Sequence, residues 1–269
     1  MKIALTIAGS DSGGGAGIQA DLKTFHQFGL FGTSVIVALT AQNTRGVRAV
    51  EPVSESMVAA QLSALAEDLP PAALKTGMLA NASVVRLVAR AIRENGWGPL
   101  VVDPVMVATS GDRLLTSEAE DVMRDTLLPL AVLVTPNLDE AAILTGLAVH
   151  DVASMERAGT TLLTLGAGAA LVKGGHLDGD QVTDVLVTAS GIEHFTRPRI
   201  ATSSTHGTGC TLSAAVTAGL ALDRRLDEAI AGALDYVQRA IAEAPGLGSG
   251  HGPLNHTVTA PPPPPLSTW

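Results

Sequence analysis

The chain has 269 residues, 46% of them hydrophobic and 3% aromatic, and its 17 basic and 26 acidic residues give a formal net charge of −9. This size fits one large α/β domain or two small ones, with a core built from Ala, Val, Leu and Ile. The acidic balance and the lack of any block of Lys and Arg argue against nucleic acid or an anionic membrane as a partner.

Cysteine usage and hydropathy predict the compartment. The single cysteine, Cys210, cannot form an internal disulfide, which is typical of a reducing environment. The apolar run at the start of the chain is too short for a signal peptide. The most apolar long window, residues 207–222, contains Gly, Ser and Thr and is too short to span a bilayer. We therefore expect a soluble, cytoplasmic protein.

The first expected unit is a strand, a glycine loop and a helix. Residues 3–8 form an apolar strand, and residues 13–17 hold four glycines in five positions before a helical pattern that ends near Gly29. The loop lacks the Gly-Lys-Ser/Thr ending of a Walker A motif and the third glycine of a dinucleotide fingerprint. Because a simple turn does not need so many glycines, we interpret it as a loop that approaches a ligand closely.

The next expected strand, residues 33–41, ends in polar amides. Gln42 follows it at the carboxyl end, where open α/β sheets bind their ligands. Its amide offers a donor and an acceptor side by side, which complements the edge of a 4-aminopyrimidine. The local sequence alone favours a simpler interpretation, in which Gln42 is a turn amide that satisfies backbone groups.

Strand and helix patterns then alternate to the end of the chain. The expected strands are residues 47–53, 73–76, 100–102, 131–134 and 169–172. The expected helices are residues 55–67, 83–94, 117–127, 152–165, a stretch that ends near 222, and 226–243. Residues 183–187 and 193–197 read as an edge hairpin, and residues 108–113 as a polar loop suited to a lid.

This alternation predicts one doubly wound, mostly parallel sheet flanked by helices. The sequence contains no internal repeat and no clear linker. We expect a single domain over residues 1–258, followed by a proline-rich C-terminal tail at residues 259–269.

Chemistry-bearing side chains follow several of the expected strands. Asp103 comes directly after one strand, and Lys173 directly after another. An acid in this position often serves metal or phosphate chemistry. Asn137 and Glu140 have the spacing of a helix cap, which alone favours a structural role. Because the carboxyl ends of parallel strands meet at one edge of a sheet, their convergence favours a functional role for each.

Residues 205–213 contain the strongest candidate site. Gly207 and Gly209 enclose Thr208 and precede Cys210, and a helix of small residues follows. Glycines let backbone N–H groups turn inward, and a helix N-terminus adds the positive end of its dipole, which together form an anion cradle. The stretch alone supports equally an ordinary glycine turn with Cys210 as a small buried hydrophobe.

Eight motifs in this order resemble the ribokinase-like superfamily and, more closely, the bacterial hydroxymethylpyrimidine/phosphomethylpyrimidine kinases of thiamine biosynthesis. The motifs span nearly the whole chain, at residues 4–11, 14–23, 40–44, 75–79, 102–106, 135–137, 173–176 and 205–211. The resemblance implies a three-layer α/β/α domain, usually dimeric, that uses ATP and Mg²⁺. It implies phosphoryl transfer to the hydroxymethyl oxygen of 4-amino-5-hydroxymethyl-2-methylpyrimidine, and a second transfer to the monophosphate that makes the pyrophosphate.

The resemblance also implies roles for individual residues. Cys210 acts as the general base or positions the substrate hydroxyl, and Lys173 neutralises phosphate charge. The implied anion hole includes Gly207, Thr208 and Gly209. The implied substrate-binding residues are Gln42, Gly9, Asp21, Met78 and Val105. The implied nucleotide-binding residues are Asp103, Asn137, Lys173 and Thr208. The implied metal-ordering residues, which hold Mg²⁺ through water, are Asp103 and Glu140.

Cys210 also separates this chain from the wider superfamily. Sugar kinases usually carry Asp at this place, whereas the pyrimidine kinase branch resembles this sequence in having Cys. A helix N-terminus lowers the pKa of a thiol, so we expect a thiolate at neutral pH. A pyridoxal kinase of the same fold and a non-catalytic pyrimidine-binding sensor remain as alternatives. Gln42 with Met78 favours the aminopyrimidine, and Cys210, Lys173 and Glu140 together favour an enzyme.

Overall fold

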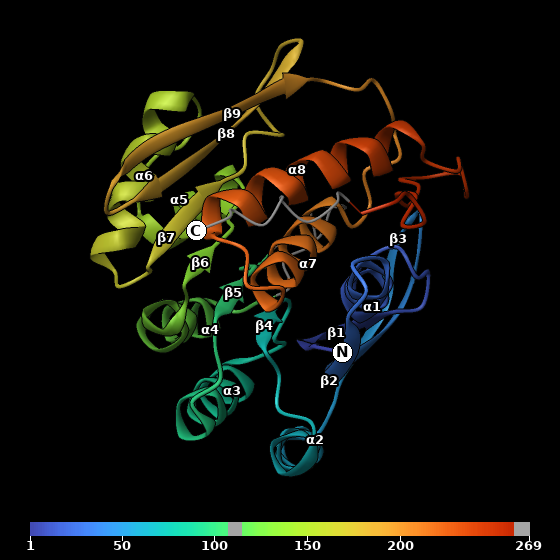
Figure 1. Cartoon of the computed structure of the whole chain (residues 1–269), viewed down its shortest axis with the longest axis vertical. Coiled ribbons are helices and arrows are strands. Elements are labelled where there is room, and N and C mark those ends of the chain that lie inside the picture. The colour runs from blue at the N-terminus through green and yellow to red at the C-terminus, as the bar shows by residue number, and fades with distance from the viewer. Residues whose placement is uncertain (107–114, 261–269) are drawn as a thin grey trace, which may run out of the picture.

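The computed structural model describes residues 1–106 and 115–260. Within them, nine strands form one sheet in the order β3-β2-β1-β4-β5-β6-β7-β8-β9, with helices on both faces (Figure 1). This confirms the predicted α/β class with a central, mostly parallel sheet. The expected lid at residues 108–113 and the tail at residues 261–269 lie outside the described residues.

The described strands and helices follow the predicted order closely. The strands are β1 (Ile3–Asp11), β2 (Phe31–Asn43), β3 (Gly46–Pro52), β4 (Ala73–Thr76), β5 (Leu100–Val102), β6 (Leu133–Val134), β7 (Ala169–Val172), β8 (Gln181–Thr188) and β9 (Gly191–Pro198). The α-helices are α1 (Gly17–Gln27), α2 (Glu55–Asp68), α3 (Ala82–Asn95), α4 (Ser117–Val122), α5 (Leu138–Thr145), α6 (Val152–Thr164), α7 (Thr208–Ala221) and α8 (Leu226–Ala242).

Two elements differ from the sequence prediction by more than two residues at one end. β1 continues past Ala8 to Asp11, because the start of the expected glycine loop pairs with β2 after a bulge between Ala8 and Gly9. The helix expected over residues 117–127 is divided, since α4 passes into a π-helical turn at Met123–Leu127 and then a short 3₁₀ turn at Leu128–Leu130.

Strand direction places the ligand-binding edge of the sheet. β2, β1, β4, β5, β6 and β7 run parallel. At the two edges of the sheet, β3 pairs antiparallel with β2, β8 with β7, and β9 with β8. The chain leaves β1 toward β2 on one side and later returns to β4 on the other. Ligands of doubly wound sheets bind at the carboxyl ends of the strands where the order reverses in this way.

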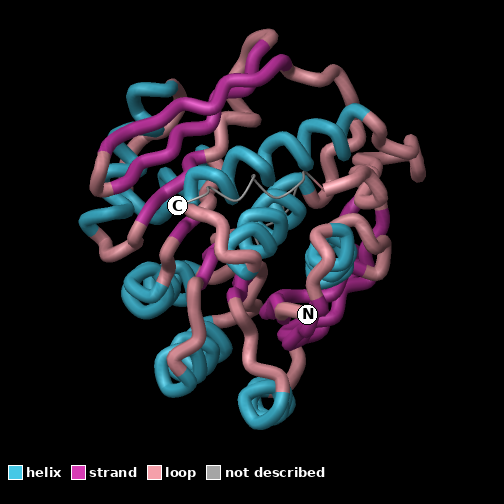
Figure 2. Tube along the Cα trace, in the orientation of Figure 1, coloured by secondary structure: helices cyan, strands magenta, loops and turns pink. Residues whose placement is uncertain are grey.

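Helices cover the sheet on both faces, as Figure 2 shows, and the strand sequences reflect this. Along β5, Leu100 and Val102 join the apolar cluster with α3, while Val101 joins the cluster with α7 and α8. Successive strand residues point to opposite faces, so a strand covered on both faces is apolar throughout. No helix of the described chain is long and apolar enough to cross a membrane.

Helix α7 owes its small residues to its position. It lies between the sheet and α8, and residues such as Ala214, Ala215 and Ala218 are fully buried (Figure 1). A Cβ on Gly219 would lie 3.0 Å from Ala229 Cα of α8, so the glycine permits this close helix–helix approach. This packing directs the first turn of α7 toward the carboxyl ends of the parallel strands.

Candidate active site

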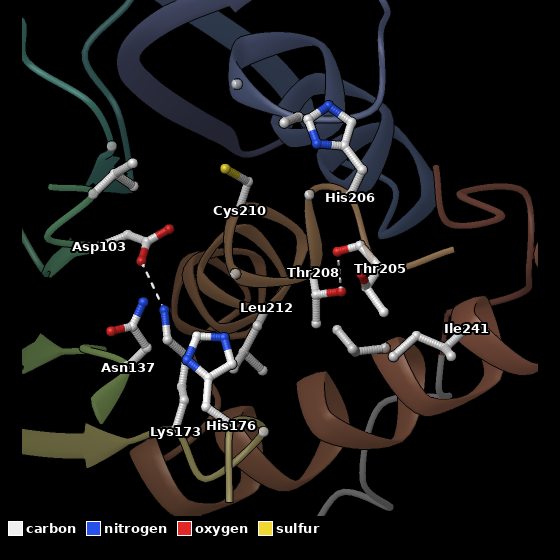
Figure 3. A pocket seen from close by; sticks show the side chains of 18 of the residues that line it. Asp103, Asn137, Lys173, His176, Thr205, His206, Thr208, Cys210, Leu212 and Ile241 are labelled. Carbon is white, nitrogen blue, oxygen red and sulfur yellow. Dashed lines mark hydrogen bonds and ion pairs between the residues drawn. The ribbon is translucent and has the colours of Figure 1, made fainter. Parts of the chain in front are cut away.

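A cavity of about 570 Å³ lies over the first turn of α7, at the carboxyl ends of the parallel strands. Figure 3 places Cys210 at the start of this helix, with Asp103 and Lys173 on one side and His206 on the other. The predicted site residues that line the cavity are Gly9, Gln42, Met78, Asp103, Val105, Asn137, Glu140, Lys173, Gly207, Thr208, Gly209 and Cys210. The fold therefore brings together residues from the ends of six strands and from the start of α7.

The N-terminus of α7 has the form of an anion cradle. Its N-cap residue, Gly207, has φ +83° and caps the helix without any side-chain hydrogen bond. A Cβ on Gly207 would lie 1.9 Å from the carbonyl oxygen of Gly15, so only glycine fits against the glycine loop here. Thr208 and Cys210 line the cavity in the first turn, where backbone N–H groups have no partner inside the helix.

A cluster of charged side chains faces this cradle. Lys173 Nζ lies 3.1 Å from Asp103 Oδ1 and 3.8 Å from Glu140 Oε2. A Cβ on Gly209 would lie 3.2 Å from the same ammonium group, so a side chain at this position would displace it. Asp103 also accepts a hydrogen bond from Ser213 Oγ of α7 at 3.2 Å. The lysine is therefore held at the mouth of the anion cradle.

Burial and charge pull the pKa values of this cluster in different directions. Burial raises the pKa of Glu140 to about 7, against the opposing effect of Lys173. Burial also disfavours the charge of Asp103, but Lys173 and Lys75 hold the pKa of that carboxyl below its usual range. Burial opposes the charge of Lys173 as well, yet Asp103 and Glu140 raise its pKa. Asp103 and Lys173 therefore form an ion pair, and Glu140 is the group that additional positive charge would ionise.

Asn137 and Glu140 form the helix cap that their spacing predicts. Asn137 Oδ1 accepts a hydrogen bond from Glu140 N at 2.9 Å, and Glu140 Oε2 accepts one from Asn137 N at 2.7 Å. This capping box begins α5. The structural interpretation is confirmed, and the same Glu140 carboxylate also faces Lys173, so one side chain contributes to both the cap and the charged cluster.

The Asp103 and Glu140 carboxylates suit a divalent cation that binds through water. Lys173 contacts both carboxylates, so the two do not converge directly on one ion. Among the described residues, no group of three or more His, Cys, Asp or Glu side chains could hold a metal. Carboxylates with an excess of negative charge beside a phosphate-binding cavity match the usual mode of Mg²⁺, which keeps several of its waters.

Cys210 corrects one prediction. Its side chain is half-buried at the cavity, and burial raises the pKa of its thiol to about 12. Lys75 and the backbone of Gly17 lower this pKa, but the carboxylates of Asp103 and Asp21 oppose them. The expected thiolate at neutral pH is therefore wrong, and Cys210 is protonated. The helix N-terminus was visible in the sequence, whereas the burial of the thiol and its proximity to the two carboxylates depend on the fold.

Asp21 corrects a second prediction, because it does not line the cavity. Its fully buried carboxylate accepts a hydrogen bond from Lys75 Nζ at 2.8 Å and one from Thr6 Oγ1 at 2.6 Å. Sequence reasoning missed Lys75 as a functional candidate. The available signal was a lysine inside the buried strand β4, since a buried lysine needs an acidic partner.

Sequence reasoning also missed Asp11 and His206. Asp11 organises the glycine loop, since its carboxylate accepts hydrogen bonds from the backbone N–H groups of Gly13, Gly15 and Ala16. Its Oδ2 also lies 2.9 Å from His206 Nε2. Burial opposes the charge of Asp11, but these contacts lower the pKa of its carboxyl. A short acid two residues before a glycine run was the signal for such a turn.

The far end of the cavity has an apolar wall. It is lined by Leu212 of α7, by Leu234, Val237 and Ile241 of α8, and by Ile200. Figure 3 labels Leu212 and Ile241. No local motif marks these residues, because they come from two helices and a loop that meet only in the fold. Apolar walls of this kind suit a flat aromatic base.

Comparisons with known proteins agree with this geometry. A model of the family described as phosphomethylpyrimidine kinase matches residues 11–255. A hydroxymethylpyrimidine/phosphomethylpyrimidine kinase from Rhizobium meliloti is 52% identical over 257 residues, which cover 94% of this chain and 96% of that relative. The chain belongs to the phosphomethylpyrimidine kinase family. It is therefore a phosphotransferase, and the resemblance of its motifs is confirmed.

Solved structures support the fold of this kinase. The crystal structure of phosphomethylpyrimidine kinase from Clostridium difficile superimposes with a TM-score of 0.81 at 43% identity. The match covers 90% of this chain and 100% of that chain. An ADP complex of Bacillus subtilis pyridoxal kinase superimposes with a TM-score of 0.90 at 38% identity, covering 96% of this chain and 98% of that one. The fold is thus ribokinase-like, and it is shared by a phosphomethylpyrimidine kinase and a pyridoxal kinase.

Proposed function

We propose that this kinase uses ATP to phosphorylate 4-amino-5-hydroxymethyl-2-methylpyrimidine and then phosphorylates the monophosphate to the pyrophosphate, in thiamine biosynthesis. The observation that carries the proposal is the single cavity over the uncapped first turn of α7. Gln42 lies at one end of it and the Lys173–Asp103–Glu140 cluster at another. A hydroxymethyl group at one end and a triphosphate at the other would meet at Cys210.

The pyrimidine end offers hydrogen bonds and apolar surface. Gln42 presents the amide that would pair with the amino group and a ring nitrogen of the substrate. Gly9, Met78 and Val105 line the same part of the cavity. A Cβ on Gly9 would lie 2.6 Å from Met78 Cε, so the lack of a side chain at Gly9 leaves room for Met78, which would lie beside the pyrimidine ring. Asp21 does not line the cavity and would act indirectly, through its ion pair with Lys75.

At the centre, Cys210 would hold the hydroxymethyl oxygen. A thiol with a pKa of about 12 is protonated at neutral pH, so we assign it first to positioning the hydroxyl by a hydrogen bond. A base role would require bound ligands to lower that pKa. Phosphoryl transfer depends mainly on positioning and charge stabilisation, so a strong base is not required.

At the phosphate end, the backbone N–H groups around Gly209 and the ammonium group of Lys173 would stabilise the transferred phosphoryl group. Asp103 and Glu140 would hold Mg²⁺ through water, and the ion would supply charge neutralisation of the ATP phosphates. Asn137 and Thr208 would contact the nucleotide. The apolar wall of α8 would receive the base.

We further propose a cytoplasmic homodimer in which residues 1–258 form one domain. Leu39 of β2 and Val50 of β3 are exposed apolar side chains at the edge of the sheet, and a partner subunit would cover them. Light scattering of the purified chain tests the dimer.

Turnover on two substrates tests the proposed function. We expect Mg²⁺-dependent ADP release with the aminopyrimidine to exceed that with pyridoxal, because pyridoxal has no amino group for Gln42 to bind. Preference for pyridoxal would assign the chain to the other activity of this fold. Binding of the pyrimidine without ADP release would instead indicate a sensor.

A further inference from the structure

The amide of Gln42 has a polar neighbour on each flank. In the amide orientation that the structure has, Gln42 Nε2 lies 3.3 Å from His206 Nε2, and Gln42 Oε1 lies 3.3 Å from Thr40 Oγ1. Its backbone is fixed, because Gln42 N donates to Ser12 Oγ at 2.8 Å and Ser12 Oγ donates to the Gln42 carbonyl at 2.7 Å. The remaining freedom is a 180° rotation of the amide, which exchanges its oxygen and nitrogen.

The proton on His206 decides the first flank. His206 Nε2 lies 2.9 Å from Asp11 Oδ2, and the Asp11 carboxylate already accepts backbone N–H groups of the glycine loop. A carboxylate held by this many donors is ionised, so His206 Nε2 must carry a hydrogen. A protonated Nε2 is a donor and cannot accept a hydrogen bond from the amide nitrogen. The one Nε2 hydrogen is directed at Asp11 Oδ2, so Gln42 can only share it in a three-centre hydrogen bond, and the amide oxygen is the only atom of the amide that can accept it.

The hydroxyl of Thr40 favours the same amide orientation on the second flank. Thr40 Oγ1 donates its single hydrogen to the carbonyl oxygen of Ser10 at 2.9 Å. Toward Gln42 the hydroxyl can therefore only accept, and it suits the amide nitrogen. One rotation of the amide satisfies both flanks, and the opposite orientation leaves both unpaired.

We infer that the Asp11–His206 pair, together with Thr40, locks the Gln42 amide with Oε1 toward His206 and Nε2 toward Thr40, and that this lock selects the substrate edge and its direction. The inference rests on the proposed pairing of Gln42 with the pyrimidine. The edge of the amide that faces the cavity then offers one oxygen lone pair on the His206 side and one N–H on the Thr40 side. It fits a ring that brings its amino group to the His206 side and its acceptor nitrogen to the Thr40 side.

The locked orientation also directs the reacting group. In the substrate the amino-bearing carbon lies between the acceptor nitrogen and the carbon that carries the hydroxymethyl group. With the amino group on the His206 side, the hydroxymethyl group lies on that side too. His206 immediately precedes Gly207 of the anion cradle, so this orientation brings the hydroxyl toward Cys210. The opposite amide orientation would direct it toward Thr40 and away from the cradle.

The lock predicts discrimination between amino and oxo rings. The 4-oxo analogue presents an acceptor beside a ring N–H, the reverse of the amino edge. To bind it, the amide must rotate and lose both flanking partners. Leaving buried polar groups unpaired typically costs a factor of about 10 to 100 in affinity. His206 and Thr40 are therefore positioning residues that act through Gln42.

The experiment compares kcat/KM for the 4-amino substrate and its 4-oxo analogue in wild type and in two pairs of variants. His206→Leu removes the donor, and His206→Gln keeps a nitrogen donor near the position of Nε2. We expect His206→Leu to lower the amino-over-oxo ratio at least about tenfold, chiefly through KM of the pyrimidine, with KM of ATP unchanged. His206→Gln should keep most of the ratio. Thr40→Val should lower it less, and Thr40→Ser should restore it.

An unchanged ratio in both His206→Leu and Thr40→Val would overturn the inference, as would a loss of the ratio in His206→Gln equal to that in His206→Leu. Should the His206 variants not fold, ¹⁵N NMR of histidine-labelled wild type reads the proton directly. A neutral ring with its proton on Nδ1 overturns the inference, and a proton on Nε2 supports it. Wild-type enzyme without activity on the aminopyrimidine would instead refute the proposed function, so the two failures are distinct.

Discussion

Among the helices that begin at the cavity, α5 and α7 complete their first turns in different ways. α5 starts with a capping box in which Asn137 and Glu140 satisfy each other's backbone N–H groups. α7 starts at Gly207, which has positive φ and no side-chain cap. A capped N-terminus stabilises its own helix, whereas an uncapped one leaves donors available to an anion. The comparison is consistent with the proposal that α5 positions the charged cluster and that α7 would bind the phosphoryl group.

The largest expected effect comes from the charge that faces α7. Lys173→Met removes the ammonium group between Asp103 and Glu140 and leaves two buried carboxylates at the phosphate end. We expect kcat to fall by about 10³-fold, as when a group that stabilises transition-state charge is lost. Steady-state kinetics with saturating pyrimidine measure this. Lys173→Arg is the matched control and should retain more activity than Lys173→Met. Equal loss in both would contradict a charge role.

Cys210 lies in the uncapped turn itself. Cys210→Ala should lower kcat by about 10²-fold while the pyrimidine still binds, because in our proposal the thiol orients the hydroxyl rather than the ring. Isothermal titration with the pyrimidine and a rate measurement separate the two effects. Cys210→Ser keeps a group that can hydrogen-bond the hydroxyl, so it should recover part of the rate. Unchanged turnover in Cys210→Ala would remove any role of this side chain in the reaction.

The first turn of α7 has no side-chain cap, but its Thr211 side chain contacts a buried histidine. Thr211 Oγ1 lies 3.0 Å from Nε2 of the buried His256, and burial lowers the pKa of His256 to about 4. The unfolded chain binds this proton near the usual pKa, so stability is present above about pH 6.5 and is lost as the pH falls toward 4.

We expect the free energy of unfolding to drop by about 2 kcal/mol between pH 7 and pH 5 through this group alone. Urea unfolding at both pH values measures the drop in wild type and in His256→Gln. The variant should lack this part of the pH dependence. An identical pH dependence in both proteins would show that His256 is not the responsible group.

The smallest effect is expected at the capped helix. Asn137→Ala removes the cap of α5 and should cost about 1 kcal/mol of unfolding free energy. Asn137→Asp keeps an N-cap acceptor and should retain most of that stability. Thermal unfolding compares the two variants. A larger loss of stability in Asn137→Asp than in Asn137→Ala would show that the side chain does not act as a cap.

Local sequence patterns predicted most of the fold and much of the site. Short apolar stretches such as Leu100–Val102 predict buried strands because both faces of a parallel sheet are covered. The spacing of Asn137 and Glu140 predicts the α5 cap because a capping box involves residues three positions apart. Features of this kind depend on neighbours in the chain, and a single sequence contains them.

The sequence by itself determined the order of strands and helices, the glycines of the cradle and the residue types available for phosphoryl transfer. The tertiary structure alone decided which of those side chains meet. Asp11 and His206 are 195 residues apart in the chain, and Lys75 and Asp21 pair beneath the cavity. The protonated state of Cys210 depends on burial and on carboxylates from distant segments. Electrostatic effects act through space, so only the folded chain sets them.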